Sequence, residues 1–276
     1  MLKYLEEYHR PRDLRQALTL LKRKEIPTHV LAGGTELVLS KSPNIRAVVD
    51  LSALGLDSIE IGDTVRFGAM VRLQTLVSNP DVKALANGMI SEAARREGTY
   101  AIRNLATVGG TIAVSNSTST LTVMLLVLDT QVEINGESDQ KVSLENLLEK
   151  KGKYIASNIL TAAEFPNPNG WGFGLWTVAK LESDEPILVA AAAVKKENGK
   201  ASDVRIALGG VHRRPIRIRE MEKLLLEAGT IDEMTKVMPK LSEMISPRGN
   251  LRASGEYRKE VAPVAARRAL TMAWEA

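Results

Sequence analysis

Cysteine is absent from this chain of 276 residues. A disulfide, a thiolate nucleophile and a Cys-ligated zinc or iron–sulfur cluster are therefore excluded within it. The three histidines, His9, His29 and His212, lie far apart and lack the spacing of metal ligands. The sequence thus predicts neither a metal site nor cysteine-based catalysis.

Long apolar runs are also missing, and none approaches the ~20 residues that a membrane-spanning helix requires. The first residues, MLKYLEEYHRPRDL, include acidic side chains and lack the continuous apolar stretch of a secretory signal. We therefore expect a cytoplasmic protein without a membrane span. A hydrophobic content of 44% is ample for a core, and the length of the chain favours more than one domain.

A strong excess of charge is missing as well, because the net charge is only +4. One local cluster of positive charge is present, at Arg213, Arg214, Arg217 and Arg219. Few aromatic residues lie near it. The cluster is more typical of a solvated face or of a contact with an acidic partner than of a nucleic-acid site, so no nucleic acid is expected as a partner.

The apolar periodicity of residues 1–166 predicts a first domain that mixes helices and strands. Asp13 and Gln16 form a capping-box pattern before a helix, and residues 58–69 read as a β-hairpin. Pro80 is expected to open one long helix, and LTVMLLVL a buried helix. Residues around the second Gly-Gly pair, near residue 109, are expected to be irregular.

The composition changes after Pro166, where FPNPNGWG is typical of a linker, so a second domain is expected over residues 167–276. Three strands are predicted there, in GFGLWTVAKL, PILVAAAAVKK and SDVRIALGGV. Helical patterns follow around residues 216–228, 231–245 and 254–274, and Pro263 is expected to kink or split the last of them. A sheet followed by helices implies a separate α+β domain.

Two stretches, VLAGGTELVL and TVGGTIAV, each place Gly-Gly-Thr between apolar residues. Glycine allows backbone amides to come close to a ligand, and a concave run of amides attracts phosphate. No Lys or Arg lies within either stretch, so such a site would bind through oriented backbone dipoles. A tight structural turn is the alternative for each. Neither stretch fits G-x-G-x-x-G or G-x-x-x-x-G-K-[ST], so a Rossmann or P-loop site has no support.

Five segments follow one another along the chain at the spacing of a known family: VLAGGTEL, AIRNLATVGGTIA, NILTAAEFP, DVRIALGGVHRRPIR and ASGEYRKEVAPVAARRAL. Together they resemble the FAD-binding medium subunit of the molybdenum hydroxylases, the xanthine dehydrogenase and carbon monoxide dehydrogenase family. The resemblance covers nearly the whole chain. It implies an α+β fold, in which a two-subdomain FAD-binding PCMH-type domain (vanillyl-alcohol-oxidase-like, subdomains about 1–54 and 55–166) precedes a C-terminal three-stranded antiparallel sheet with helices.

The resemblance also implies the cofactor site. Residues 32–37 would wrap the FAD pyrophosphate and residues 107–111 would close on it from the other side, with Leu31 and Leu160 lining the cofactor. Glu36 is expected to turn away from the phosphates, because like charges repel in a half-dry site, and to cap backbone amides or meet the polar atoms on the sugar side of FAD. The implied FAD-binding residues are Leu31, Ala32, Gly33, Gly34, Thr35, Glu36, Leu37, Thr107, Val108, Gly109, Gly110, Thr111, Thr120 and Leu160.

Two of these positions depart from the family pattern. Thr111 stands where the family usually has Asn, and Thr120 stands where it usually has an Asp that accepts hydrogen bonds from the adenosine side of FAD. A lost charged hydrogen bond is worth roughly 1.5–3 kcal/mol, or about ten- to a hundredfold in affinity. Weakened, altered or partner-dependent FAD binding is therefore a specific expectation.

The function implied by the resemblance is that of an oxidoreductase subunit with no catalytic acid, base or nucleophile of its own. Because the chain has no cysteines, electrons must reach its FAD from another polypeptide. In the family these partners are a small [2Fe-2S] subunit and a large molybdopterin subunit, in a heterotrimer that can dimerise. Two alternatives stay open: an assembly subunit that has weakened or lost FAD binding, and a free-standing flavin oxidase.

Overall fold

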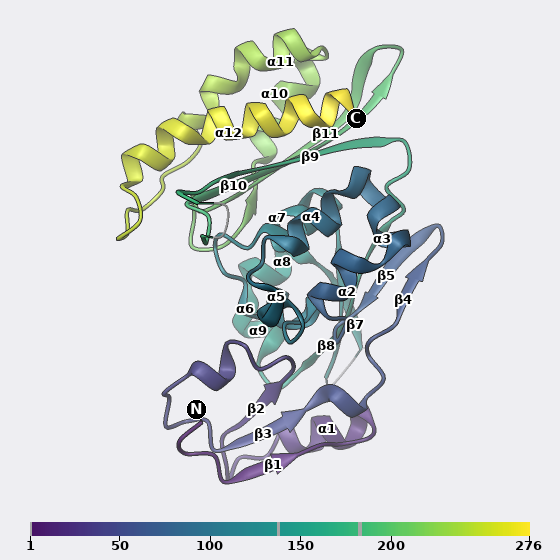
Figure 1. Cartoon of the computed structure of the whole chain (residues 1–276), viewed down its shortest axis with the longest axis vertical. Coiled ribbons are helices and arrows are strands. Elements are labelled where there is room, and N and C mark those ends of the chain that lie inside the picture. Colours follow the sequence, from purple (N-terminus) through teal and green to yellow (C-terminus); the bar gives the residue numbers. More distant parts are fainter. Residues whose placement is uncertain (1, 137–138, 182–183) are drawn as a thin grey trace. The chain divides into compact units, whose positions relative to one another are not determined.

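The computed structural model describes residues 2–136, 139–181 and 184–276, and the chain forms two compact units (Figure 1). Unit 1 comprises Met1–Thr75, Tyr100–Val114 and Gln131–Pro166. Unit 2 comprises Leu76–Thr99, Ser115–Thr130 and Asn167–Ala276. The chain therefore alternates between the units. Within the described residues, no helix has the length and apolar character needed to cross a membrane.

A small parallel sheet begins unit 1, in the order β1 (Glu7–His9), β3 (Ala47–Asp50), β2 (Thr28–Leu31). Helix α1 (Leu14–Leu21) packs on it through Ala17 and Leu21. The side chain of Asp13 accepts a hydrogen bond of 2.8 Å from the amide of Gln16, which confirms the predicted cap. Strand β2 leads directly into the first Gly-Gly pair and then into the 3-10 helix η1 (Leu37–Leu39).

An antiparallel sheet of five strands forms the rest of unit 1. Its order is β4 (Ile59–Ile61), β5 (Thr64–Gly68), β8 (Ile159–Pro166), β6 (Gln131–Asn135) and β7 (Gln140–Ser143). The predicted hairpin is confirmed by the antiparallel pairing of β4 and β5. Short helices accompany the sheet: α5 (Tyr100–Arg103), α6 (Val108–Val114), α8 (Leu144–Glu149) and α9 (Lys151–Ile155), while α2 (Leu73–Ser78) spans the point where the chain leaves the unit.

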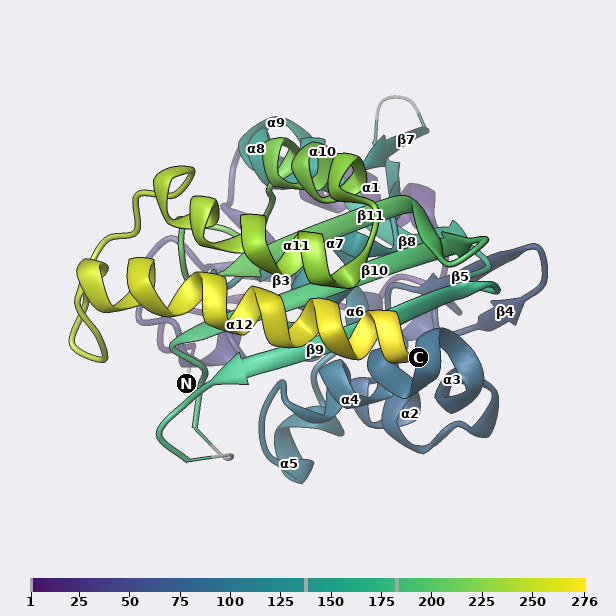
Figure 2. The same cartoon turned by 90° about the horizontal axis from the view of Figure 1, so that it is seen from above.

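Unit 2 is built on an antiparallel sheet in the order β12 (Ile216–Arg217), β11 (Lys200–Gly209), β10 (Leu188–Glu197), β9 (Trp171–Val178). The three long strands confirm the predicted ones, and β12 is a short addition. Helices α10 (Arg219–Ala228), α11 (Ile231–Val237) and α12 (Gly255–Glu275) and the 3-10 helix η4 (Met238–Glu243) cover one face, as Figure 2 shows. Helix α7 (Thr120–Val127) lies against the other, in contact with β10 and β11.

Burial on both sides explains why β10 carries the continuous apolar run LVAAAAV, every residue of which is buried. On one side, small residues let α12 approach closely. A Cβ at Gly172 or Gly174 of β9 would lie 2.0 Å from the carbonyl oxygen of Ala273 or Ala269. The backbone of α12 therefore rests directly on the strand, where any larger side chain would separate them.

Three expectations about helices need correction. The long helix expected from Pro80 is wrong: the chain forms α3 (Pro80–Ala84), the 3-10 helix η3 (Leu85–Gly88) and α4 (Met89–Arg95). Left-handed φ angles of 49° at Ala86 and 54° at Asn87 break the helix, and the Asn87 side chain accepts a hydrogen bond from the amide of Phe173. Pro263 does not split α12, which is held by its buried face. The residues of the second Gly-Gly pair are helical, in α6.

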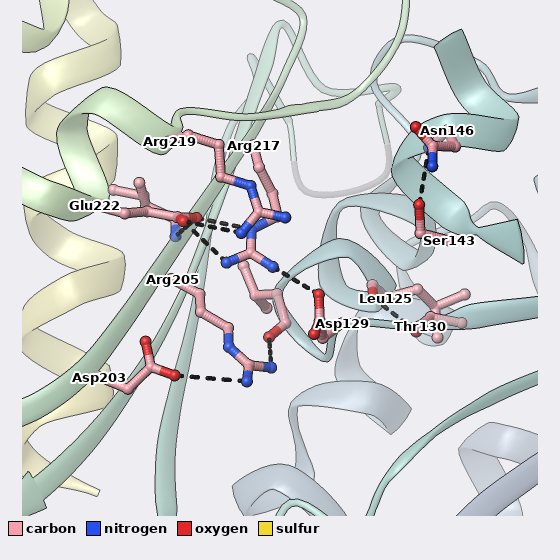
Figure 3. A network of polar contacts seen from close by, with 12 residues as sticks. Leu125, Asp129, Thr130, Ser143, Asn146, Asp203, Arg205, Arg217, Arg219 and Glu222 are labelled. Carbon is pink, nitrogen blue, oxygen red and sulfur yellow. Dashed lines mark hydrogen bonds and ion pairs between the residues drawn. The ribbon is translucent and has the colours of Figure 1, made fainter. Parts of the chain in front are cut away.

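A buried ion-pair network stabilises unit 2 (Figure 3). Arg217 donates from Nε and Nη2 to the two carboxylate oxygens of Glu222, at 2.8 and 2.9 Å, and from Nη1 to Asp129 at 2.9 Å. Glu222 also accepts the backbone amide of Ile206 at 3.0 Å. The guanidinium of Arg205 lies 4.2 Å from the ring centre of Trp171. This network ties the segment that follows α7 to the C-terminal sheet.

Candidate functional site

The two Gly-Gly segments meet within unit 1, and the contact requires glycine at position 33. A Cβ on Gly33 would lie 1.9 Å from the carbonyl oxygen of Leu105 and 3.0 Å from the Cα of Ala106. Both atoms belong to the backbone that leads into the second segment. No larger residue can occupy position 33 unless these two stretches of backbone separate.

Gly34 has a different requirement. Its φ is +71°, in the left-handed region that L side chains rarely adopt. The turn at Gly34 places Leu31 and Val38 about it, with side-chain atoms 3.3 and 3.2 Å from where a Cβ would be. The chain thus reverses at Gly34, and η1 follows, with the amide of Val38 donating to the carbonyl of Gly34 at 3.0 Å.

The first segment presents unpaired backbone donors. Among the described residues, the amides of Gly33, Gly34, Thr35 and Glu36 have no hydrogen-bond acceptor. All but Glu36 belong to half-buried residues. Unpaired amides on a tight turn form a concave positive potential that suits an anion such as phosphate. The side chain of Glu36 is exposed and makes no capping bond, so its charge is not held against these amides.

The second segment presents almost none. The amides of Val108 and Gly109 donate to the carbonyls of Val71 and Ala69, at 2.9 and 2.8 Å. The amide of Gly110 donates to the Thr107 hydroxyl at 3.1 Å, and that of Thr111 to the Thr107 carbonyl at 2.9 Å. Thr107, Val108 and Gly109 are buried, whereas Gly110 and Thr111 are half-buried. This segment therefore supplies few free donors.

Glycine in the second segment serves close packing. A Cβ on Gly109 would lie 2.6 Å from the Cβ of Ala69. The amide of Ala69 in turn donates to the carbonyl of Thr161, next to Leu160 on β8, at 2.8 Å. On the other side, a Cβ on Gly110 would lie 3.9 Å from Ala32 of the first segment. Leu160, the second segment and the first segment therefore lie close together in unit 1.

The charge near α6 lies at its far end. The ammonium of Lys151 donates to the carbonyl of Val114, the last residue of α6, at 2.7 Å. Partial burial lowers the pKa of Lys151 below its ordinary value. Neither glycine segment contains a cationic side chain, so the donors within these two segments are backbone amides and threonine hydroxyls.

Residues 3–168 match the family described as the FAD binding domain in molybdopterin dehydrogenase, and residues 178–273 match the CO dehydrogenase flavoprotein C-terminal domain. The chain belongs to this family of molybdopterin dehydrogenase flavoproteins. It is an FAD-binding medium subunit of the carbon monoxide dehydrogenase type. The first glycine segment fits that cofactor, because its unpaired amides can donate hydrogen bonds to a pyrophosphate.

Individual relatives also include medium subunits of dehydrogenases and hydroxylases. The chain is 28% identical over 267 residues to the glyceraldehyde dehydrogenase medium chain of Sulfolobus acidocaldarius, covering 93% of this chain and 94% of that one. It is 29% identical to the nicotine 6-hydroxylase medium subunit of Paenarthrobacter nicotinovorans, covering 91% of each. Carbon monoxide dehydrogenase from Hydrogenophaga pseudoflava has the same fold, with a TM-score of 0.89 at 24% identity over 100% of this chain and 99% of that chain.

Thr120, which stands at the usual Asp of the family, lies in unit 2 and is buried. Its hydroxyl donates to the carbonyl of Ala93 at 2.7 Å and to Glu97 Oε1 at 3.1 Å. The same carboxylate oxygen accepts the Ser119 hydroxyl and the Leu121 amide, both at 2.7 Å. Burial raises the pKa of Glu97 although these donors oppose the shift. A carboxylate is therefore present beside Thr120, contributed by a residue 23 positions earlier.

Sequence reasoning missed the residues that hold the glycines in place. Leu105, Ala106 and Ala69 matter for their backbone position rather than their side-chain chemistry, so no residue type in a single sequence marks them. Glu97 was missed for another reason. A glutamate within REGTY looks like surface charge, and only the tertiary contact with Ser119 and Thr120 distinguishes it.

Proposed function

We propose that this chain is the electron-transfer subunit of a molybdenum hydroxylase complex. It receives electrons from a small [2Fe-2S] subunit, supplied in turn by a large molybdopterin subunit, and passes them to an external acceptor. When bound, FAD connects one-electron carriers to two-electron acceptors, and the protein supplies its binding and orientation. The observation that carries the proposal is an amide-lined glycine turn in a chain that has no cysteine to hold a redox cluster.

The proposed division of labour follows the geometry of unit 1. The unpaired amides from Gly33 to Glu36 would hold the pyrophosphate, and Gly110 and Thr111 would close the site opposite them. The buried residues Thr107, Val108 and Gly109 would hold Gly110 and Thr111 in position and would not contact the cofactor through their side chains. Leu31, Leu37 and Leu160 would provide apolar surface. Thr120 belongs to unit 2, and its role on the adenosine side stays a prediction of the family resemblance.

The proposal extends to the organisation of the chain and its surroundings. Residues 1–166 would be the FAD-binding part, and residues 167–276 the second domain. The named relatives act on glyceraldehyde and nicotine, judged by their names. Medium subunits of this family thus occur in complexes with unrelated substrates, which supports the view that another subunit selects the substrate. The cytoplasmic location expected from the sequence stays a prediction.

The test is the visible spectrum of the purified chain, before and after incubation with FAD. We expect a yellow protein, or one that becomes yellow after incubation with FAD and removal of the free FAD. After assembly with the partner subunits, addition of the substrate of the complex should bleach the flavin absorbance. A protein that stays colourless in saturating FAD would contradict the proposal. That result would favour the alternative of an assembly subunit. Two observations support this alternative: the amides of the second segment are already hydrogen-bonded, and threonine stands at positions 111 and 120.

A further inference from the structure

The cluster of arginines found in the sequence divides into two groups in the structure. Arg217 is buried against Glu222 and Asp129, and Arg219 lies 3.5 Å from the same Glu222 (Figure 3). Arg213 and Arg214 have no ion-pair partner among the described residues. The first pair stabilises the fold of unit 2, so only the second pair is free to act on something outside the chain.

A third arginine joins the free pair from a distant part of the sequence. The pKa of His212 is lowered, first by partial burial and then by the charges of Arg214, Arg213 and Arg248. Arg248 belongs to a loop whose Asn250 shares Arg258 with the carbonyl of Gly210, two residues before His212, so the arginines come from two segments held by one side chain. Arg248 also lacks an ion-pair partner within the part of the chain that the structure describes. We call His212, Arg213, Arg214 and Arg248, with the loop 246–254, the cationic face.

A buried arginine, Arg258, connects the two segments that form this face, residues 212–214 and the loop 246–254. Arg258 is 3% exposed and donates to the carbonyls of Ile187 and Gly210 and to the side chain of Asn250. Gly210 directly precedes the segment of His212, and Asn250 lies within the loop. Asn250 Oδ1 also accepts the amide of Arg252 at 2.9 Å. The loop is thus held by defined hydrogen bonds, so its surface is organised before any partner arrives.

An apolar side chain stands at the tip of this loop. Leu251 has a relative exposure of 107%, the highest of the large hydrophobic residues of the described chain. The loop that carries it projects beyond the start of α12 in both views (Figures 1 and 2). An apolar anchor surrounded by arginines is typical of protein interfaces, where a few such residues supply most of the binding energy.

We propose that the cationic face docks an acidic surface with an apolar recess on a partner subunit of the oxidoreductase complex. This inference rests on the proposed function. Leu251 would fill the recess, and the arginines would pair with carboxylates around it. A small anion would leave Leu251 without a contact, because an exposed apolar side chain offers nothing to an anion. The unpaired charges would also accelerate association.

The test uses the tagged chain co-expressed with its iron–sulfur and molybdopterin subunits. Wild type is compared with Leu251→Asp and with the double variant Arg213→Glu/Arg214→Glu. Matched controls come from the exposed side of α10 in the same unit, Leu226→Asp and Lys223→Glu. Retention of the partner subunits is measured at about 50 mM and about 300 mM NaCl, because ions screen exposed charges over distances of about 14 and 6 Å respectively. FAD content is measured in each sample.

We expect wild type and controls to retain both subunits at low salt, and each face variant to bind a subunit at least tenfold more weakly with unchanged FAD content. Face variants that retain the partners as wild type does would overturn the inference while leaving the proposed function intact. If the face variants lose FAD but retain the partner subunits, the face serves the cofactor. If they lose only self-association, the face binds a second copy of the chain. Either result would overturn the inference. Wild type that binds neither subunit would contradict the inference and the proposed function together.

Discussion

Replacing Gly33 by alanine should damage both the fold of unit 1 and its binding of FAD. The added Cβ would lie 1.9 Å from Leu105 O and 2.6 Å from Leu105 C, both backbone atoms that cannot rotate away. The two segments must then separate by more than an ångström to restore ordinary contact. Overpacking of this kind costs about 1–3 kcal/mol, so we expect the free energy of unfolding to fall by that amount.

The same displacement would move the amides from Gly33 to Glu36 away from the position proposed for the pyrophosphate. Loss of one hydrogen bond to a charged group costs about 1.5–3 kcal/mol, which corresponds to a ten- to hundredfold weaker affinity for FAD. Gly110→Ala separates the two effects. Its Cβ would lie 3.0 Å from the Thr107 hydroxyl, which must yield by a few tenths of an ångström, and 3.9 Å from Ala32. We therefore expect a smaller loss of stability than for Gly33→Ala, while the methyl group narrows the gap between the two segments.

Gly152→Ala is the matched control, because nothing lies within 4 Å of its added Cβ. In a helix this change should be neutral or stabilising by up to about 1 kcal/mol. Chemical denaturation gives the stability of each variant, and fluorescence titration of the apoprotein gives its affinity for FAD. A Gly33→Ala protein that is as stable as Gly152→Ala and binds FAD normally would refute the packing argument.

Three further predictions concern unit 2. Arg217→Met should lower the free energy of unfolding by about 3–5 kcal/mol, because it leaves Glu222 buried without its partner; Asp129→Asn, at a half-exposed partner, should cost about 1 kcal/mol or less in the same denaturation assay, and equal losses would contradict this ranking. Glu97→Gln should gain stability relative to wild type as the pH rises above 4.5, the ordinary pKa of a glutamate. Because the pKa of Glu97 is raised in the folded state, folded wild type binds more protons than the unfolded chain and loses stability as the pH rises. Parallel stability profiles of the two proteins against pH would contradict this prediction. Thr120→Asp alone should destabilise the protein, because it adds a second carboxylate beside Glu97, and Thr120→Asp/Glu97→Gln should restore stability; additive losses in thermal melts would show that the two side chains do not interact.

Local sequence signals predicted the elements that depend on local chemistry. The Asp13 cap, the β4–β5 hairpin and the three long strands of unit 2 follow from capping and from apolar periodicity. The break after Pro80 could not be predicted in the same way. Left-handed residues other than glycine are unfavourable by themselves, and here Asn87 is held by a hydrogen bond to Phe173, 86 positions away.

The candidate site shows the same division. Two Gly-Gly-Thr stretches and the family resemblance predicted that both segments serve one cofactor, and the structure brings the two segments together. The sequence did not reveal that they differ: the first leaves its amides unpaired, whereas the second uses its amides on Val71, Ala69 and Thr107. The acceptors belong to backbone groups distant in sequence, and backbone groups carry no residue-specific signal. For the same reason, the loss of Asp at position 120 could be seen, but not the carboxylate of Glu97 beside it.

Amide hydrogen exchange can show whether the turn from Gly33 to Glu36 binds the FAD pyrophosphate, because it reports on the backbone donors themselves. Exchange at Gly33, Gly34, Thr35 and Glu36 is measured in the apoprotein and in saturating FAD. We expect rapid exchange at these amides without FAD and at least tenfold slower exchange with it, while exchange at the hydrogen-bonded amides of Val108 and Gly109 changes little. FAD that binds tightly and leaves exchange at Gly33–Glu36 unaltered would contradict the claim that this turn holds the pyrophosphate.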